Sequence, residues 1–166
     1  MTDGLFRKLR AGALVASVSA VGLAACGDSV GPEVDWETIE GVTFDPALGI
    51  ELDSMYVTGS GVYWEDRVAG TGEPAVFGST PFIRVQNWLA DGTFIAADTF
   101  GFLMGNNRVL AGLEDGLVNQ KTGGTRLMII PPTRGYAGQA QYDEAGNVVI
   151  PPGSVLVFEV TVDSVK

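Results

Sequence analysis

The chain contains no histidine and only one cysteine among its 166 residues, and these two absences exclude several kinds of site. Without an imidazole there is no Ser-His-Asp or Cys-His relay, no His-ligated metal and no His proton shuttle near neutral pH. Zinc sites of the usual kinds need several Cys or His ligands, and one Cys cannot form a disulfide within the chain. We therefore predict that the protein has no metal site.

Basic residues are also few: ten Lys and Arg stand against twenty Asp and Glu, for a net charge of −10. The phosphate backbone of a nucleic acid attracts Lys and Arg, so this balance predicts no nucleic-acid partner. The hydrophobic fraction of 46% is too high for a disordered acidic tail. The composition instead predicts one globular domain with an N-terminal appendage.

The first 25 residues have the pattern of a secretory signal segment. Residues 1–10 hold three basic side chains and one acidic side chain, and residues 11–25 carry no charge. The uncharged run is shorter than the roughly 20 apolar residues that a transmembrane helix needs. It ends in Leu23-Ala24-Ala25-Cys26, which resembles a bacterial lipobox, and the resemblance implies that Cys26 is lipidated and that residues 1–25 are removed. The alternative is a soluble secreted protein in which Cys26 has no such role.

Lipidation at Cys26 predicts an extracytoplasmic protein of the bacterial cell envelope, anchored to either the inner or the outer membrane. Removal of residues 1–25 takes the net charge from −10 to −12, which discourages contact with anionic membrane surfaces. Two or more acyl chains anchor a protein stably, so the lipid is predicted to be the only membrane contact. Residues 26–47, rich in Gly, Pro and acidic residues, are predicted to form a tether, and residues 48–166 the folded domain.

Alternation of apolar and polar residues dominates the domain. In residues 154–162, the side chains of Leu156, Phe158, Val160 and Val162 share one face, which predicts a half-buried antiparallel strand. Similar runs, separated by glycine-containing turns, occur at residues 61–68, 81–89 and 125–130.

One segment, residues 107–119, predicts a helix, with an apolar stripe formed by Leu110, Leu113 and Leu117. Glu114 and Asp115 are predicted to lie on its solvated side. Two glycines within the segment lower its helix propensity by about 1 kcal/mol each relative to Ala, so packing must stabilise the helix. A short helix on an antiparallel sheet is an α+β architecture, which is the predicted fold class.

An ordered series of short motifs runs through the domain. The series consists of Leu89-Ala90-Asp91-Gly92-Thr93, Phe100-Gly101-Phe102-Leu103-Met104-Gly105, Arg108-Val109-Leu110-Ala111-Gly112-Leu113-Glu114-Asp115-Gly116, Gly123-Gly124-Thr125-Arg126-Leu127-Met128-Ile129-Ile130-Pro131-Pro132, Gly135-Tyr136, Ile150-Pro151-Pro152 and Leu156-Val157-Phe158-Glu159-Val160. In order and spacing it resembles the FK506-binding-protein (FKBP) type of peptidyl-prolyl cis-trans isomerase, over about residues 61–166. The resemblance implies a twisted antiparallel β-sheet wrapped around one short α-helix, with an apolar hollow between them as the active site.

The resemblance also implies roles for individual residues. Among the catalytic residues, the hydroxyl of Tyr136 binds a ligand carbonyl, the backbone N–H of Leu110 fixes the substrate, and Phe100 forms part of the wall. The implied substrate-binding residues are Val85, Ile95, Val109, Leu113, Ile150 and Phe158.

Several of these positions depart from the usual pattern of the family. Val85 stands where the family has a pocket tyrosine, and Leu113 stands where it has the tryptophan of the pocket floor. Ile95 and Ala96 replace a Phe-Asp pair. The hollow is therefore predicted to be wider and less aromatic, and to lack the carboxylate. The loop of residues 137–149 over it is predicted to be longer than the common form.

The resemblance implies an isomerase that assists the folding of exported proteins. Rotation about an Xaa-Pro bond crosses a barrier of about 18 to 20 kcal/mol set by amide resonance, and it needs neither a proton nor a nucleophile. An apolar hollow with one or two hydrogen-bond donors disfavours the charge-separated planar amide relative to the twisted transition state, so no cofactor is predicted. The predicted partners are proline-containing unfolded or exported proteins and macrolide ligands of the FKBP type. The protein is predicted to be a monomer.

Two other interpretations stay open. The same fold can serve as a catalytically weak or inactive chaperone or binding module anchored to the membrane, with turnover lost through the altered pocket residues. A structural envelope lipoprotein would need no pocket at all. A proline-isomerisation assay distinguishes the first of these from an enzyme, and a macrolide-binding test addresses the second.

Overall fold

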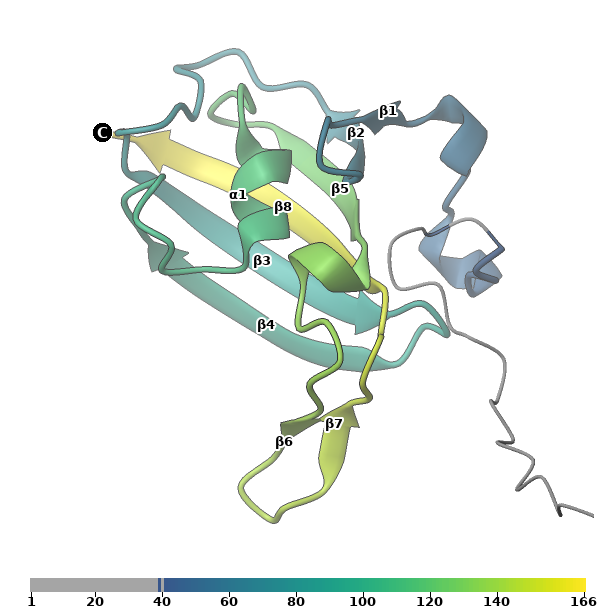
Figure 1. Cartoon of the computed structure of the whole chain (residues 1–166). Coiled ribbons are helices and arrows are strands. Elements are labelled where there is room, and N and C mark those ends of the chain that lie inside the picture. The colour runs from purple at the N-terminus through teal and green to yellow at the C-terminus, as the bar shows by residue number, and fades with distance from the viewer. Residues whose placement is uncertain (1–38, 40) are drawn as a thin grey trace, which may run out of the picture. The chain divides into compact units, whose positions relative to one another are not determined.

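The computed structural model of the chain describes residue 39 and residues 41–166 (Figure 1). The predictions for the signal segment and Cys26 lie outside the described residues. None of the helices in the described part of the chain has the length and hydrophobicity that a membrane crossing needs. The elements are η1 (Pro46–Leu48), η2 (Leu52–Ser54), β1 (Tyr56–Val57), β2 (Tyr63–Val68), β3 (Pro81–Leu89), β4 (Phe94–Gly101), α1 (Ala111–Leu117), β5 (Thr125–Ile130), η3 (Pro132–Arg134), β6 (Gln141–Tyr142), β7 (Val148–Ile150) and β8 (Leu156–Val165).

Six strands form one sheet in the order β1-β2-β5-β8-β3-β4, and every neighbouring pair is antiparallel. Figure 1 shows α1 lying across one face of this sheet. The predicted α+β class, an antiparallel sheet with one short helix, is confirmed. The predicted strands at residues 81–89 and 125–130 coincide with β3 and β5, while β2 begins two residues later than predicted and β8 runs on to Val165.

Strand β4 and the short hairpin of β6 and β7 were not predicted as strands. β4 lies at the edge of the sheet, and most of its residues are exposed. It therefore has no buried row of alternating apolar residues for a sequence pattern to reveal. The hairpin begins inside the predicted long loop of residues 137–149, ends one residue beyond it at Ile150, and forms a separate two-stranded sheet.

The inner core fills the space between α1 and the sheet. The four apolar residues that were predicted to share one face of β8 all belong to this core. We call it the inner cluster, and its buried members are Val62, Ala75, Ile83, Val85, Phe102, Met104, Leu113, Leu117, Met128, Ile130, Ile150, Leu156, Phe158, Val160 and Val162.

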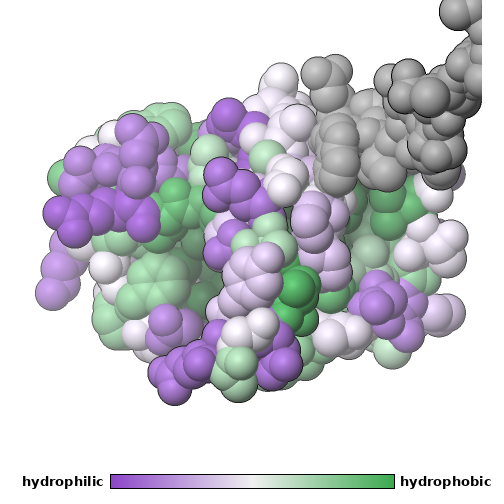
Figure 2. Space-filling model, turned by 60° about the horizontal axis from the view of Figure 1, so that its bottom comes forward, coloured by the Kyte–Doolittle hydropathy of each residue, from purple (hydrophilic) through white to green (hydrophobic). Residues whose placement is uncertain are grey.

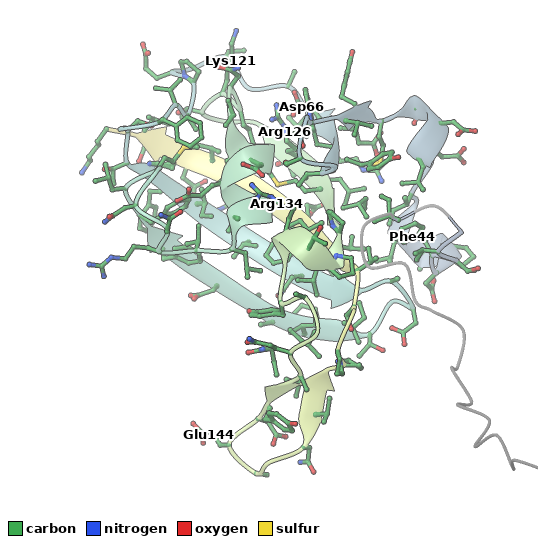
Figure 3. All side chains as sticks on the ribbon, in the orientation of Figure 1. Phe44, Asp66, Lys121, Arg126, Arg134 and Glu144 are labelled. Atoms are coloured by element: carbon green, nitrogen blue, oxygen red, sulfur yellow. The ribbon has the colours of Figure 1, made fainter. Side chains whose placement is uncertain are left out.

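A second core lies on the opposite face of the sheet and is formed with the segment that precedes β1. Ile39, at 2% exposure, and Met55 pack there against the outward side chains of β5 and β8, with Phe44 (Figure 3) partly buried beside them. The packed part of the chain thus starts before residue 48, inside the segment predicted as a tether. We call this core the outer cluster, and its buried members are Ile39, Met55, Leu127, Ile129, Val155 and Val157.

Arg126 of β5 joins the end of the helix to the sheet (Figure 3). Its side chain is 3% exposed, and its guanidinium carbon lies 3.7 Å from the centroid of the Trp64 ring. The guanidinium donates to the carboxylate of Asp66 at 2.7 Å and to the carbonyl oxygens of Gly116 and Val118 at 2.8 and 3.2 Å. A buried cation is tolerated when it is paired and hydrogen-bonded, and the last carbonyls of a helix need outside donors. Arg126 meets both needs at once.

Two glycines allow α1 to approach β5 closely. A Cβ at Gly112 would lie 2.3 Å from Cγ2 of Ile130 and 3.1 Å from the backbone oxygen of Arg134. A Cβ at Gly116 would lie 2.5 Å from Sδ of Met128. Packing against the sheet therefore stabilises a seven-residue helix of low intrinsic propensity, as the sequence predicted.

The prediction that Glu114 lies on the solvated side of the helix is wrong. Its side chain is buried at 5% exposure, and its carboxylate accepts a hydrogen bond from the N–H of Gly105 at 3.3 Å. The neighbouring Asp115 forms an ion pair with Arg134 and accepts a hydrogen bond from the Ser60 hydroxyl at 2.7 Å. The loop before α1, the β1–β2 turn and η3 each contact these polar side chains, which the spacing within the helix alone could not show.

Gly112→Ala is expected to lower the free energy of unfolding by about 1 to 3 kcal/mol, because the added Cβ overpacks against Ile130 and the Arg134 backbone. Helix propensity alone predicts the opposite, a gain of about 1 kcal/mol. Gly116→Ala is the matched control, since its close neighbour is a flexible methionine side chain, and it should lose less. Urea unfolding followed by circular dichroism measures both, and a Gly112→Ala protein as stable as wild type would contradict the close approach.

Candidate active site

A hollow of about 260 Å³ lies between the start of α1 and strands β3, β4 and β8. Figure 2 shows this face of the molecule hollowed, with hydrophobic green surface inside and hydrophilic purple side chains around it. The hollow is lined by Val85, Asn87, Ala96, Asp98, Phe100, Val109, Leu110, Leu113, Tyr136 and Phe158.

The register of three strands brings one wall together. Val85 of β3 lies opposite Asp98 of β4, and Asn87 lies opposite Ala96 on one side and Phe158 of β8 on the other. Residues directly opposite each other in antiparallel strands point to the same face of the sheet. This register places their side chains on the inner face, below the start of the helix.

The other wall comes from the helix and the segment after η3. Val109 and Leu110 precede α1, and Leu113 follows one turn later, buried at 3% exposure. Leu110 is the N-cap residue of α1, and its carbonyl accepts hydrogen bonds from the N–H groups of Leu113 and Glu114 at 3.0 and 3.2 Å. The result is an aliphatic floor faced by Phe100 and Phe158 from the sheet.

Seven of the nine pocket residues implied by the sequence resemblance line this hollow, and two do not. Ile95 lies at a bulge, where Asn87 pairs with Ala96 but Trp88 pairs with Phe94, and it packs against the inner cluster outside the hollow. Ile150 ends β7 and is buried within the inner cluster. The bulge breaks the simple alternation along β4, and Ile95 therefore lies outside the row of β4 residues that line the hollow.

The expectation of a hollow without a carboxylate is wrong, because Asp98 is in its lining. Asn87 is a second polar lining residue that the sequence analysis did not name. The position expected to hold the carboxylate is Ala96, and Asp98 lies two residues further along the same face of β4, between Ala96 and Phe100. Side chains two residues apart on a strand share a face. Because Phe100 was already assigned to the pocket, this rule predicts that Asp98 faces the pocket as well.

Several hydrogen-bond donors at the hollow are unused. Among the described residues, the backbone N–H of Leu110, the hydroxyl of Tyr136 and the side-chain amide of Asn87 donate no hydrogen bond. An unpaired backbone N–H beside an apolar surface is a strong site for a ligand carbonyl. The hollow thus combines apolar walls with donors that a bound amide can use.

The position of Tyr136 is fixed from two sides. Nε of Arg134, just before it, donates to the carboxylate of Asp115 on α1 at 2.9 Å (Figure 3 labels Arg134). Ala137, just after it, donates its N–H to the carbonyl of Pro132 at 2.7 Å and has a φ of +51°. A left-handed conformation costs a non-glycine residue about 1 kcal/mol or more, so this turn is maintained by its surroundings.

The hairpin of β6 and β7 projects beyond the sheet, with Glu144 near its tip (Figures 1 and 3). Its turn is closed by Asp143, whose carboxylate accepts hydrogen bonds from the side chain and the backbone of Asn147 at 2.9 and 2.8 Å. These bonds hold the pKa of Asp143 below its usual value. Tyr142 and Val148 of the hairpin are more than half exposed.

Comparison with known proteins identifies the family. The family model of the FKBP-type peptidyl-prolyl cis-trans isomerases matches residues 74–163, a range that includes every residue lining the hollow. The chain therefore belongs to the FKBP-type peptidyl-prolyl cis-trans isomerase family.

Curated relatives match the same part of the chain. FK506-binding protein 3 of Candida albicans is 34% identical over 110 residues, which cover 64% of this chain and 24% of that protein. The 46 kDa FK506-binding nuclear protein of Spodoptera frugiperda is 31% identical over 111 residues, covering 64% of this chain and 26% of that protein. The chain thus spans about a quarter of the length of the relatives that it matches.

Solved structures show the same fold. The crystal structure of AtFKBP13 superimposes with a TM-score of 0.60 at 28% identity, over 67% of this chain and 98% of that one. FkpA from Escherichia coli superimposes with a TM-score of 0.58, also at 28% identity, over 73% of this chain and 55% of that one.

Proposed function

We propose that this protein catalyses the cis-trans isomerisation of Xaa-Pro bonds and assists the folding of exported proteins at the cell envelope. The observation that carries the proposal is the apolar hollow with unused donors, among them the N–H of Leu110 and the hydroxyl of Tyr136. Membership of the isomerase family supports the type of reaction.

The chemistry follows from the change in the amide during rotation. The planar Xaa-Pro amide is more charge-separated than the twisted transition state, so its transfer from water into the hollow raises the ground state relative to the transition state. The N–H of Leu110 holds one substrate carbonyl, and the Tyr136 hydroxyl donates to another. The reaction requires no nucleophile and no proton transfer, which suits a chain without histidine, and it requires no cofactor.

A binding module or chaperone is the second candidate, and the composition of the hollow favours it. Val85 and Leu113 are aliphatic at positions where the family usually has aromatic rings. Smaller side chains make fewer contacts with a bound prolyl ring, and turnover depends on contacts that are stronger in the transition state than in the ground state. The isomerase is therefore proposed to be a weak one.

The cellular setting of the proposal rests on the sequence. The lipobox-like run that ends at Cys26 supports lipidation and an extracytoplasmic, membrane-anchored protein. Its clients would then be exported chains that contain proline, and an FKBP-type macrolide would compete with them for the hollow. The proposed anchor places a monomeric domain beside the membrane without inserting it.

Tyr136→Phe is expected to lower kcat/KM on an Xaa-Pro tetrapeptide by about threefold to tenfold, because one neutral hydrogen bond contributes about 0.5 to 1.5 kcal/mol. Tyr63→Phe is the matched control, since Tyr63 packs against the outer cluster away from the hollow, and its rate should equal that of wild type. Both rates should survive EDTA. A wild-type rate equal to the uncatalysed one would contradict the proposed isomerase activity.

Cys26→Ser tests the anchor. Wild-type cells fed radiolabelled palmitate should yield a labelled, membrane-associated protein, because acyl chains contribute about 0.8 kcal/mol per buried methylene to membrane binding. The Cys26→Ser chain should stay unlabelled and should accumulate as an uncleaved or soluble form. Label in the variant, or an unlabelled wild type, would contradict lipidation at this residue.

A further inference from the structure

Of the ten residues that line the hollow, Asp98 alone carries a charge. We propose that Asp98 is a specificity-determining residue that favours substrates with a Lys or Arg next to the proline. This inference rests on the proposed function, because it names the substrate class of the same hollow.

The carboxylate of Asp98 makes no ion pair with any residue that the structure describes. It accepts one hydrogen bond, from the N–H of Thr99 at 2.7 Å. Within the described part of the chain, no Lys or Arg nitrogen lies within 4.0 Å of it. The residue is exposed, so an incoming ligand can reach it.

Arg84 lies next to Val85 on β3, and it is already paired. Its side chain points to the face of the sheet opposite to that of Val85, because neighbouring residues of a strand alternate between the two faces. There it lines a groove of about 440 Å³ together with Gln86 and Thr99. The guanidinium of Arg84 makes three hydrogen bonds of 2.9 to 3.1 Å to the carboxylate of Asp163. These bonds hold the pKa of Asp163 below its usual value. The structure thus leaves the negative charge of Asp98 for a ligand.

Asp98 is positioned to contact the side chain of the residue next to a bound proline. Asp98 lies between Ala96 and Phe100 in the lining, so a residue next to a proline held in the hollow can approach its carboxylate. The partly exposed ring of Phe100, two residues along the same strand, offers packing surface to the methylene stem of Lys or Arg.

The charge of the whole chain acts in the same direction. A net charge of −10 attracts cationic peptides and repels anionic ones at long range. This general attraction does not depend on Asp98, so a test must separate the local effect from the global one. A charge-matched control variant outside the hollow does so.

The test compares Ala-Xaa-Pro-Ala peptides in which Xaa is Lys, norleucine or Glu, and a second series with the same residues after the proline. Cis-trans exchange is measured by NMR with the whole 166-residue chain in mild detergent. In at least one series, kcat/KM should fall in the order Lys, norleucine, Glu. Asp98→Asn should lower the Lys-to-norleucine ratio by about twofold to fivefold, the range expected for a partly exposed ion pair. High salt should have the same effect.

Asp53→Asn is the control, because Asp53 is an exposed residue of η2 and Leu52 beside it packs against the outer cluster. It changes the net charge equally and should leave all ratios unchanged. Equal rates for the three peptides, or an Asp98→Asn ratio equal to that of Asp53→Asn, would overturn the inference.

A binding measurement keeps the two proposals distinguishable. Turnover of the norleucine peptide reports on the isomerase itself. If no peptide is turned over, fluorescence anisotropy of labelled peptides still ranks their affinities, and an Asp98-dependent preference for Lys would support the inference while the isomerase proposal fails. A chain that neither turns over nor binds any of the peptides would overturn both.

Discussion

The buried guanidinium of Arg126 is the interaction on which the arrangement of helix and sheet depends. It stacks on Trp64, pairs with Asp66 and supplies donors to the last carbonyls of α1, so one side chain links β2, β5 and the helix. Isolated helices of seven residues are not stable in water, and α1 contains two glycines. Packing on the sheet and the hydrogen bonds from Arg126 therefore stabilise the helix.

The hollow follows from how the helix is held. Arg126 fastens the C-terminal end of α1, and Gly112 and Gly116 let the helix body contact β5. The N-terminal end of α1 faces β3 and β4, where Leu110 and Leu113 meet residues of the sheet across an unfilled space. A constraint at one end of a short helix thus leaves an apolar site with an unused backbone N–H at the other.

The sequence predicted those parts of the fold that obey simple periodicity. β8 was predicted because Leu156, Phe158, Val160 and Val162 recur at every second position, and α1 because its leucines repeat at helical spacing. β4 was missed because an edge strand with exposed residues carries no such pattern. The packing of Ile39 on the outer face could not be read from a segment without periodicity.

The family motifs predicted most of the residues that line the site, but not all of them. They located the lining from Phe100 to Phe158, but they also implied Ile95, which lies at a bulge of β4 outside the lining. They assigned the family's carboxylate position to Ala96 and so did not find Asp98, which gives the hollow a charged border. Tertiary context also buried Glu114, because Gly105 of the preceding loop supplies its hydrogen bond.

The central claim is that the hollow between α1 and β4 binds the Xaa-Pro bond. Titration of the ¹⁵N-labelled chain with an Ala-Leu-Pro-Phe peptide, followed by amide chemical shifts, tests it most directly. The account predicts shifts concentrated at Leu110, Asp98 and Tyr136, with Val157 of the outer cluster unchanged. Shifts centred on the outer cluster, or none at saturating peptide, would contradict it.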